Sequence, residues 1–234
     1  FVLRPENTPP ENKPALLYTI ETVRKLWRGE AVEFPKADGT MHAVVTQPRP
    51  VSKEVPIWVT TAGNPETWKE AGRIGANVLT HLLGQSIDEV AQKITLYHDA
   101  LRESGHDPAA FKVTLMLHTF VAETREIARE IAREPMKDYL RSAAGLIKQY
   151  AWAFPAFKKP EGIDNAFQLD LGSLDEEELE GILDFAFLRY FEDSGLFGTV
   201  ADCTARVESL KRIGVNEIAC LIDYGIGIDQ VLDG

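Results

Sequence analysis

The apolar positions of this chain predict alternating strands and helices that begin after residue 55. Short apolar runs rich in branched side chains are typical of buried parallel strands, and they cover residues 55–61, 76–83, 111–121 and 217–222. Apolar residues at helical spacing predict helices over residues 65–75, 86–105, 124–154 and 200–213. Ser86 and Glu89 form a capping-box pattern at the second helix. Pro135 is expected to break or kink the third.

The segment ahead of this alternation is expected to hold a loop, a helix and a hairpin. Residues 4–14 are rich in Pro, Asn and Glu and predict the loop, and residues 14–29 show helical spacing. Two short strand-like runs follow in an excursion over residues 30–50, joined through Asp38-Gly39, which is a hairpin turn signal. His42 within this hairpin is interpreted as a surface residue.

The segment 155–195 interrupts the alternation. A loop rich in Pro and Gly is predicted first, followed by a helix that starts with an acidic run at Asp175 and ends at about Asp193. Acidic residues in a first turn complement the helix dipole, so we interpret this run as a capped, solvated face.

The order of these elements predicts an α/β fold with a parallel sheet, helices outside it and right-handed crossovers. In such sheets and barrels the functional rim lies at the carboxyl ends of the strands. The predicted strand ends carry residues 61–64, His81 to Gly84, His118, and Asp223-Tyr224. These small and polar residues therefore predict a shared rim.

The corner after the first of these strands is the candidate anion site. The strand stops at Ala62-Gly63, Asn64 is a candidate N-cap, and Pro65 takes the first helical position. Free backbone N–H groups and the positive end of a helix dipole together favour an anion such as phosphate. The Thr67 hydroxyl is a further donor. The alternative is an ordinary β–α turn, which the local pattern by itself favours.

Composition and charge restrict the function further. A formal charge of −11 argues against a nucleic-acid partner. The two cysteines, Cys203 and Cys220, match neither a disulfide scaffold nor a zinc site, and we expect no metal. No run is apolar enough to span a membrane and no signal peptide is visible, so a cytoplasmic location is expected. No nucleophile with a base is found, which removes hydrolases.

The chain begins at Phe1 and ends at Gly234 soon after an apolar strand. We interpret it as an excised piece of a longer polypeptide.

The segment from Val55 to Thr67, with its continuation to Leu79, resembles the middle of the bacterial luciferase-like flavin monooxygenases. The run Thr22–Gly29 is similar to the "LW-x-G" helix of that family, and the runs 196–199 and 207–215 are similar to the approach to its eighth strand. His81-Leu-Leu-Gly-Gln85, the run 115–120 and the run 133–140 resemble the subgroup found in, or beside, polyketide and nonribosomal-peptide assembly lines. The resemblance covers nearly the whole chain.

The resemblance implies a (β/α)8 TIM barrel of which this chain supplies the C-terminal half, strands five to eight. The whole of residues 1–234 then belongs to one domain, with the hairpin and the 155–195 helical insertion added. The resemblance also implies that Ala62, Gly63, Asn64 and Thr67 hold an FMN phosphate, with Leu83 and Gly84 nearby. The implied reaction inserts oxygen from O2 into a substrate, using reduced flavin supplied by a reductase. F420 is an alternative cofactor, because it shares a phosphate end with FMN.

The first four strands of the family are absent here, together with the ring pocket and the basic phosphate contacts that they contribute. Half of a barrel exposes strand edges and an apolar sheet face. We therefore expect the chain to form a homo-oligomer or to pair with the missing N-terminal half. We also expect the isolated chain to bind FMN weakly or not at all. A noncatalytic barrel half that serves as an interaction or structural subunit is the alternative function.

Four residues are candidates for chemistry or substrate contact. His81 and His118 stand at strand ends where the subgroup also carries His, so each is either a catalytic residue beside flavin or a buried structural His. Asp223 and Tyr224 are candidates to line the substrate mouth, or to cap the loop. The substrate is expected to be an acyl or peptidyl small molecule, free or bound to a carrier protein. An aromatic stripe is either core or a flap that binds this substrate, and it comprises Trp152, Phe154, Phe157, Phe185, Phe187, Tyr190 and Phe191.

Overall fold

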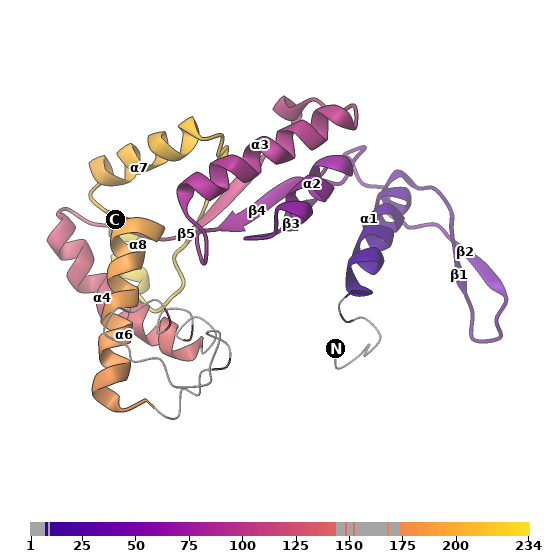
Figure 1. The fold of residues 1–234 in the computed structure, drawn as a ribbon. Coiled ribbons are helices and arrows are strands. Elements are labelled where there is room, and N and C mark those ends of the chain that lie inside the picture. Colours follow the sequence, from indigo (N-terminus) through magenta and orange to yellow (C-terminus); the bar gives the residue numbers. More distant parts are fainter. Residues whose placement is uncertain (1–7, 9, 144–147, 149–151, 153–167, 169–173) are drawn as a thin grey trace. The chain divides into compact units, whose positions relative to one another are not determined.

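The computed structural model describes residues 8, 10–143, 148, 152, 168 and 174–234 of the chain. The chain divides into two compact units, Phe1–Ile57 and Trp58–Gly234, and each is described by itself (Figure 1). The assignment of both units to one barrel domain stays a prediction.

The first unit holds a helix and a hairpin, as expected from the sequence. Helix α1 (Asn12–Arg28) ends at Gly29, whose φ of 81° lets it close the last turn in the left-handed conformation. The loop predicted over 4–14 is wrong for residues 12–14, which belong to α1, while residues 1–7 and 9 lie outside the described residues.

The hairpin pairs β1 (Val32–Pro35) with β2 (Met41–Val44) in antiparallel register. In its turn, the Asp38 carboxylate accepts a hydrogen bond of 2.9 Å from the Thr40 N–H, and Gly39 takes a φ of 79°. His42 is exposed, as expected.

The second unit is built on a parallel sheet, as the sequence predicted. Strands β3 (Trp58–Thr60), β4 (Asn77–His81) and β5 (Val113–Val121) pair in sequence, and β7 (Glu217–Leu221) pairs with the opposite edge of β5 over Thr114–His118, all in parallel. The first strand starts three residues later than predicted. Pro56 has no N–H to donate to a ladder, which disfavours a strand at that position.

Helices α2 (Pro65–Arg73) and α3 (Ile87–Glu103) follow β3 and β4 and pack against each other (Figure 1). Gly72 permits this close contact, because a Cβ there would lie 2.7 Å from the Tyr97 carbonyl oxygen. The buried Tyr97 hydroxyl donates to the Ala76 carbonyl at 2.7 Å and ties α3 to the start of β4. The predicted capping box between Ser86 and Glu89 is present. A short 3-10 helix, η1 (Pro108–Ala110), precedes β5.

Helix α4 (Arg125–Ser142) follows its N-cap Thr124, where the helix was predicted to start, and ends at Ser142. Of the predicted break or kink at Pro135, the break is wrong, because α4 continues through this residue. A proline inside a helix costs about 3 kcal/mol. That cost is offset by one apolar face whose residues have 0% exposure, namely Ala128, Ala132, Met136 and Leu140. Residues 144–147, 149–151 and 153–154 of the predicted helix lie outside the described residues.

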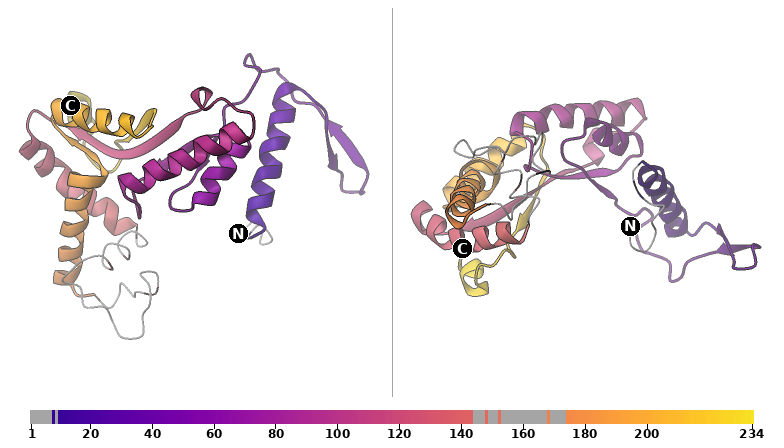
Figure 2. Two further views of the ribbon diagram at one scale, coloured as in Figure 1. Left: turned by 45° about the horizontal axis from the view of Figure 1, so that its top comes forward. Right: turned by 60° about the horizontal axis from the view of Figure 1, so that its bottom comes forward.

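Helix α6 (Glu176–Arg189), the orange helix of Figure 2, packs against α4. It continues into a π-helical turn, η4 (Tyr190–Ser194). Asp175 and Glu178 form a capping box, so the prediction that this acidic run caps a helix is confirmed. Of the segment 155–195, residues 155–167 and 169–173 lie outside the described residues.

The remaining elements include two that the sequence did not predict. Strand β6 (Leu196–Gly198) is buried and pairs with Thr119–Val121 at the end of β5. Helix α7 (Val200–Arg212) was predicted, whereas the final helix α8 (Ile228–Asp233) was not. Cys203 lies buried in α7 and Cys220 lies exposed in β7, in the helix and the strand where they were expected.

The two faces of the sheet differ in burial. Val59, Val78 and Leu115 point to one face and are at most 8% exposed. On the other face Trp58 is 39% exposed and Thr60 is exposed, although His81 and Met116 further along are half-buried. The open region at Trp58 agrees with the expected exposed sheet face.

Candidate functional site

The carboxyl ends of the strands lie on one edge of the sheet, as the sequence predicted. In the parallel register Thr60 is opposite Leu79, His81 is opposite Met116, and His118 is opposite Leu221. Side chains that follow β3, β4, β5 and β7 therefore share a rim.

The corner between β3 and α2 has the expected helix start. The Asn64 side chain accepts a hydrogen bond of 3.0 Å from the Glu66 N–H, and Pro65 opens the helix. Gly63 is exposed, and a Cβ built on it would meet no atom within 4 Å. The Ala62 carbonyl accepts from the buried Trp68 indole at 3.0 Å, which fixes the backbone just before the corner. The helix N-terminus thus opens onto free space.

Two side chains in the first turn of α2 bear on anion binding. Thr67 is half-buried, one position beyond Glu66. Glu66 carries a negative charge that opposes an anion, but its carboxylate lies 2.7 Å from the Lys69 ammonium and 4.0 Å from the Arg73 guanidinium. These ion pairs offset the negative charge of Glu66 in the first turn of α2.

The turn after β4 is fixed by hydrogen bonds that sequence reasoning missed. The Leu83 N–H donates to His81 Nδ1 at 3.2 Å, and Gly84 takes a φ of 71°. The buried Gln85 amide donates to the Thr80 hydroxyl at 3.0 Å and to the His81 carbonyl.

Lys93, buried in α3, donates to Gln85 Oε1 at 2.7 Å and so sets the orientation of the amide. A lysine on the apolar face of α3, beside Val90 and Ile94, was the signal that could have identified this contact.

His118 is the most unusual side chain on the rim. It is 5% exposed, and its Nε2 is buried with no hydrogen-bond partner among the described residues. Three tyrosine rings pack edge-on around its imidazole, with centroids at 4.8 Å for Tyr139, 5.0 Å for Tyr190 and 5.4 Å for Tyr224. Burial lowers the pKa of His118 to about 4, and the Asp223 carboxylate opposes that shift only in part. The imidazole is therefore neutral at physiological pH.

His118 and His81 both line one pocket of about 200 Å³. Burial lowers the pKa of His81 as well. Leu83 lines the same pocket, as do Tyr139 from α4 and Tyr190 and Ser194 from η4. The sequence analysis named the two histidines and Leu83 as site residues and placed Tyr190 in a stripe that is either core or a substrate-binding flap, whereas Tyr139 and Ser194 were not foreseen.

The two residues predicted to line the substrate mouth differ in burial. Tyr224 is 4% exposed, its hydroxyl donates to the Thr119 carbonyl at 3.3 Å, and its ring packs edge-on against Phe197. Asp223 is exposed. Their role toward a substrate stays a prediction.

The aromatic stripe is mainly core where the structure describes it. Phe187, Tyr190 and Phe191 are buried in the cluster that packs on α4, and Trp152 and Phe185 are half-buried. Phe154 and Phe157 lie outside the described residues. Tyr190 belongs both to this core and to the pocket wall.

The described part of the chain contains no group of three or more His, Cys, Asp or Glu residues that could hold a metal ion. Nor do the described helices include one with the length and apolar character needed to cross a membrane.

The parallel sheet, its surrounding helices and the rim at its carboxyl edge define an α/β protein of the kind that binds ligands beyond the strand ends. The luciferase-like monooxygenase family model matches residues 13–217. The chain therefore belongs to this family.

One curated relative is the oxygenase component of a flavin-dependent trigonelline monooxygenase from Acinetobacter baylyi. It is 24% identical over 217 residues, which cover 90% of this chain and 54% of the relative. The chain thus spans about half the length of this relative.

Two solved structures show the same fold. The monooxygenase RslO1 from Streptomyces bottropensis has a TM-score of 0.62 at 20% identity, covering 92% of this chain and 55% of that one. An F420-dependent secondary alcohol dehydrogenase has a TM-score of 0.60 at 18% identity, covering 97% of this chain and 60% of that one. The fold therefore matches about half of luciferase-like TIM-barrel structures.

Proposed function

We propose that this chain is the C-terminal half, strands five to eight, of a flavin-dependent oxygenase that inserts oxygen from O2 into an organic substrate. The observation that carries this proposal is the family match over residues 13–217 on a chain about half the length of its relatives. The rim at the carboxyl ends of β3, β4, β5 and β7 is the part of the active site that this half contributes.

The corner after β3 fits the terminal phosphate of the cofactor. Gly63 leaves space in front of the α2 N-terminus, where an incoming anion meets backbone N–H groups and the positive end of the helix dipole. In the proposal, Ala62, Gly63, Asn64 and Thr67 hold this phosphate, and Leu83 and Gly84 line the adjoining part of the cofactor.

The bound cofactor supplies the electrons that activate O2, and the protein binds and orients the reactants. The chain contributes a fixed turn after β4, a neutral imidazole at His118, and buried aromatic residues that exclude water. His81 and His118 are the proposed catalytic residues of this half, and Asp223 and Tyr224 the proposed substrate-lining residues.

Reduced FMN is the proposed cofactor, delivered by a separate flavin reductase, as the words "oxygenase component" in the name of the trigonelline relative suggest. F420 is the alternative, motivated by the F420-dependent structural neighbour. We propose an acyl or peptidyl substrate from a natural-product assembly line, on the basis of the subgroup resemblance.

The proposed partner is a complementary barrel half. Trp58 and Thr60 leave one face of the sheet open, and β3 has no strand beside its outer edge among the described residues. A barrel buries such a face and pairs such an edge. The same open face also favours the second candidate function, a noncatalytic half that serves as an interaction or structural subunit.

The phosphate assignment is tested by binding FMN and riboflavin, which lacks the phosphate, to the chain mixed with a separately produced N-terminal half. Thr67→Ala is expected to weaken FMN binding about 10- to 100-fold, the effect of losing a hydrogen bond to a charged group, and to leave riboflavin binding unchanged. The matched control is Thr95→Ala on α3, whose hydroxyl donates within its own helix to Ala91. Unchanged FMN affinity in Thr67→Ala would show that the corner does not hold the phosphate.

The same mixture distinguishes the two candidate functions. Flavin absorbance together with NAD(P)H-dependent oxygen uptake, in the presence of a reductase, supports the oxygenase. Stable pairing of the halves without either signal supports the noncatalytic subunit. The isolated chain is expected to bind FMN weakly or not at all, and a dissociation constant in the low micromolar range would contradict this expectation.

A further inference from the structure

The pocket around His118 has a chemical character that narrows the substrate class. Its described lining residues include two histidines, two tyrosines and a serine among apolar side chains, but no Asp, Glu, Lys or Arg. At about 200 Å³ it is smaller than the roughly 300–1,000 Å³ of a whole small-molecule site. Its size therefore suits one functional group of a ligand better than an entire ligand.

Within this pocket His118 has a hydrogen-bonding atom that the described residues do not satisfy. Its Nε2 is buried and without a partner, while most buried polar atoms in native proteins are paired. The three tyrosine rings contact the imidazole by their edges and hold the ring in place. A ligand group that exchanges a hydrogen bond with Nε2 would remove this deficit.

The electrostatics of the pocket disfavour a charged ligand. Burial keeps His118 neutral, so the imidazole offers no positive charge to a carboxylate. The nearby Asp223 carboxylate, whose field acts on His118, repels an anion further. Asp223 would attract a cation, but it is exposed and does not line the pocket, so a buried cation finds no carboxylate among the described lining residues to replace its lost hydration. A neutral carbonyl or amide has no such desolvation problem, and a neutral imidazole can act as donor or acceptor toward it.

We propose that the pocket lined by His118, His81, Tyr139 and Tyr190 binds an uncharged hydrogen-bonding group of the substrate, such as a ketone, ester or amide carbonyl, and rejects carboxylates and amines. This inference rests on the proposed function in identifying the ligand of the pocket as the substrate. Tyr139 and Tyr190 become specificity-determining residues, since their rings shape the wall that faces the polar group.

The test compares three ligands that share a ring and differ in charge: benzamide, benzoate and benzamidine. Each is titrated into the chain at pH 7, with binding followed by ligand-observed NMR and by the ¹⁵N shifts of the histidine side chains. Benzamide is expected to bind at least about tenfold more tightly than either charged ligand and to shift the His118 signals. Equal or tighter binding of benzoate or benzamidine, or no shift of His118 with benzamide, would overturn the proposal.

Two variants test whether benzamide binds in this pocket. His118→Phe and, separately, Tyr139→Ala, which removes the ring from the pocket wall, are expected to weaken benzamide binding. The first should do so by about tenfold because the unpaired Nε2 is lost. His42→Phe, in the exposed hairpin of the other unit, is the matched control and is expected to change nothing. Should His118→Phe not fold, the His118 shift in the unmodified chain still decides the outcome. No flavin takes part in the benzamide titration. Its outcome is therefore independent of the FMN-binding experiment on Thr67→Ala, and either one can fail without affecting the other.

Discussion

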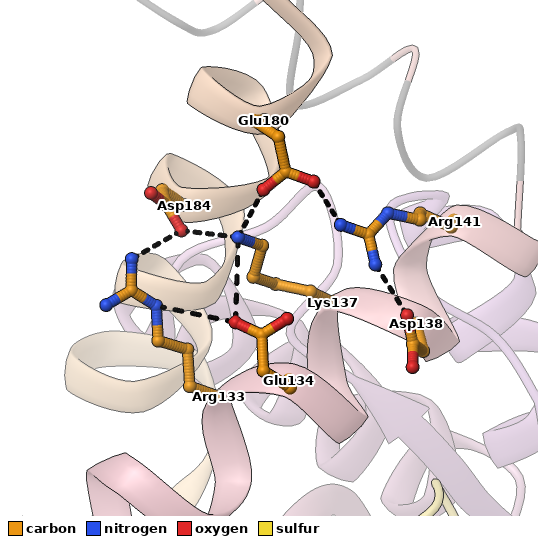
Figure 3. Close-up of polar contacts among 7 residues, drawn as sticks. All are labelled: Arg133, Glu134, Lys137, Asp138, Arg141, Glu180 and Asp184. Atoms are coloured by element: carbon orange, nitrogen blue, oxygen red, sulfur yellow. Dashed lines mark hydrogen bonds and ion pairs between the residues drawn. The ribbon is translucent and has the colours of Figure 1, made fainter. Parts of the chain in front are cut away.

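Two buried basic side chains, Lys137 and His118, lie in the second unit in opposite electrostatic situations. Both are at most 5% exposed. Lys137 projects from α4 into a group of charged residues shared with α6 (Figure 3), whereas His118 projects among tyrosine rings with one nitrogen unpaired. The first arrangement satisfies a buried charge, and the second leaves a buried neutral group available.

The charged group around Lys137, here termed the α4–α6 cluster, contains Arg133, Glu134, Lys137, Asp138, Arg141, Glu180 and Asp184. The Lys137 ammonium lies 2.5 Å from Glu180, 2.9 Å from Asp184 and 3.8 Å from Glu134. Desolvation lowers the pKa of Lys137, but the hydrogen bonds to Glu180 and Asp184 outweigh it, so the net pKa is raised. The cluster therefore holds α6 on α4 with its charges paired.

The two side chains show how a buried polar group that stabilises the fold differs from one that is available to a ligand. A buried cation without partners would be strongly destabilising, and Lys137 has several partners. A buried nitrogen without a hydrogen-bond partner is rare in native proteins and calls for an explanation. For Nε2 of His118 we propose that the explanation is ligand binding.

The largest expected effect is the loss of the Lys137 ammonium. Lys137→Met should lower the free energy of unfolding by about 3 kcal/mol, at the low end for breaking a buried ion pair because the partner carboxylates are half-exposed. Urea unfolding measures this change in the free energy of unfolding. Lys211→Met is the control, since Lys211 is exposed and lies 3.8 Å from Glu208, and no measurable change is expected there. Equal stability of Lys137→Met and the unmodified chain would show that the cluster contributes nothing.

The next prediction concerns the pH dependence of stability, which should differ between His118 and the charged residues around Lys137. His118 has an unfolded pKa near 6.5 and a folded pKa of about 4, so the unfolded state binds its proton first. The stability from neutral His118 is complete above pH 6.5 and falls as the pH is lowered to 4, by about 3 kcal/mol.

The carboxylates of the cluster respond in a lower window. The hydrogen bond from Lys137 lowers the pKa of Glu180 below 4.5, so its contribution is present above 4.5 and is lost only at lower pH. Unfolding measured from pH 7 to 3 resolves the two windows. His118→Phe should shrink the upper one and leave the smaller contributions of His81 and His98, whose pKa values burial also lowers. An unchanged upper window in that variant would assign it to those histidines.

Replacing His118 itself should have a smaller effect of the opposite sign to that at Lys137. His118→Phe removes an unsatisfied buried nitrogen and retains a ring, so the stability at pH 7 should stay the same or rise by up to about 1 kcal/mol. Calorimetry or urea unfolding checks it. A loss of several kcal/mol would mean that the imidazole is required for the fold, in conflict with the proposed binding role.

The smallest expected effect is at Tyr224, whose ring neighbours His118. Tyr224→Phe deletes a hydroxyl that donates to the Thr119 carbonyl at a long 3.3 Å. The free energy of unfolding should fall by about 0.5 kcal/mol. Benzamide binding should not change, because the lost hydroxyl faces Thr119 and the ring beside His118 is retained. A loss of benzamide binding in this variant would place the ligand against Tyr224 and redraw the pocket.

Patterns that act over a few residues were predicted well from the sequence. The capping boxes at Ser86 and Asp175 and the start of α2 at Asn64 and Pro65 are present where expected, because each depends on side chains within one helical turn. The parallel order of β3, β4, β5 and β7 followed from the alternation of the elements. The failures, a break at Pro135 and the missing β6, involve elements that are stabilised by distant contacts.

The sequence by itself indicated the luciferase-like family and the parallel α/β scaffold, and it predicted the helix start at Asn64 and Pro65 after Gly63. Only the tertiary structure decided that Tyr139, Tyr190 and Tyr224 gather around His118 and that Lys137 meets Glu180 and Asp184 across two helices. Helical and strand periods and caps are local, so they are readable along the chain. The burial and pairing of a charge depend on residues that folding brings together from different elements, and no local pattern carries that information.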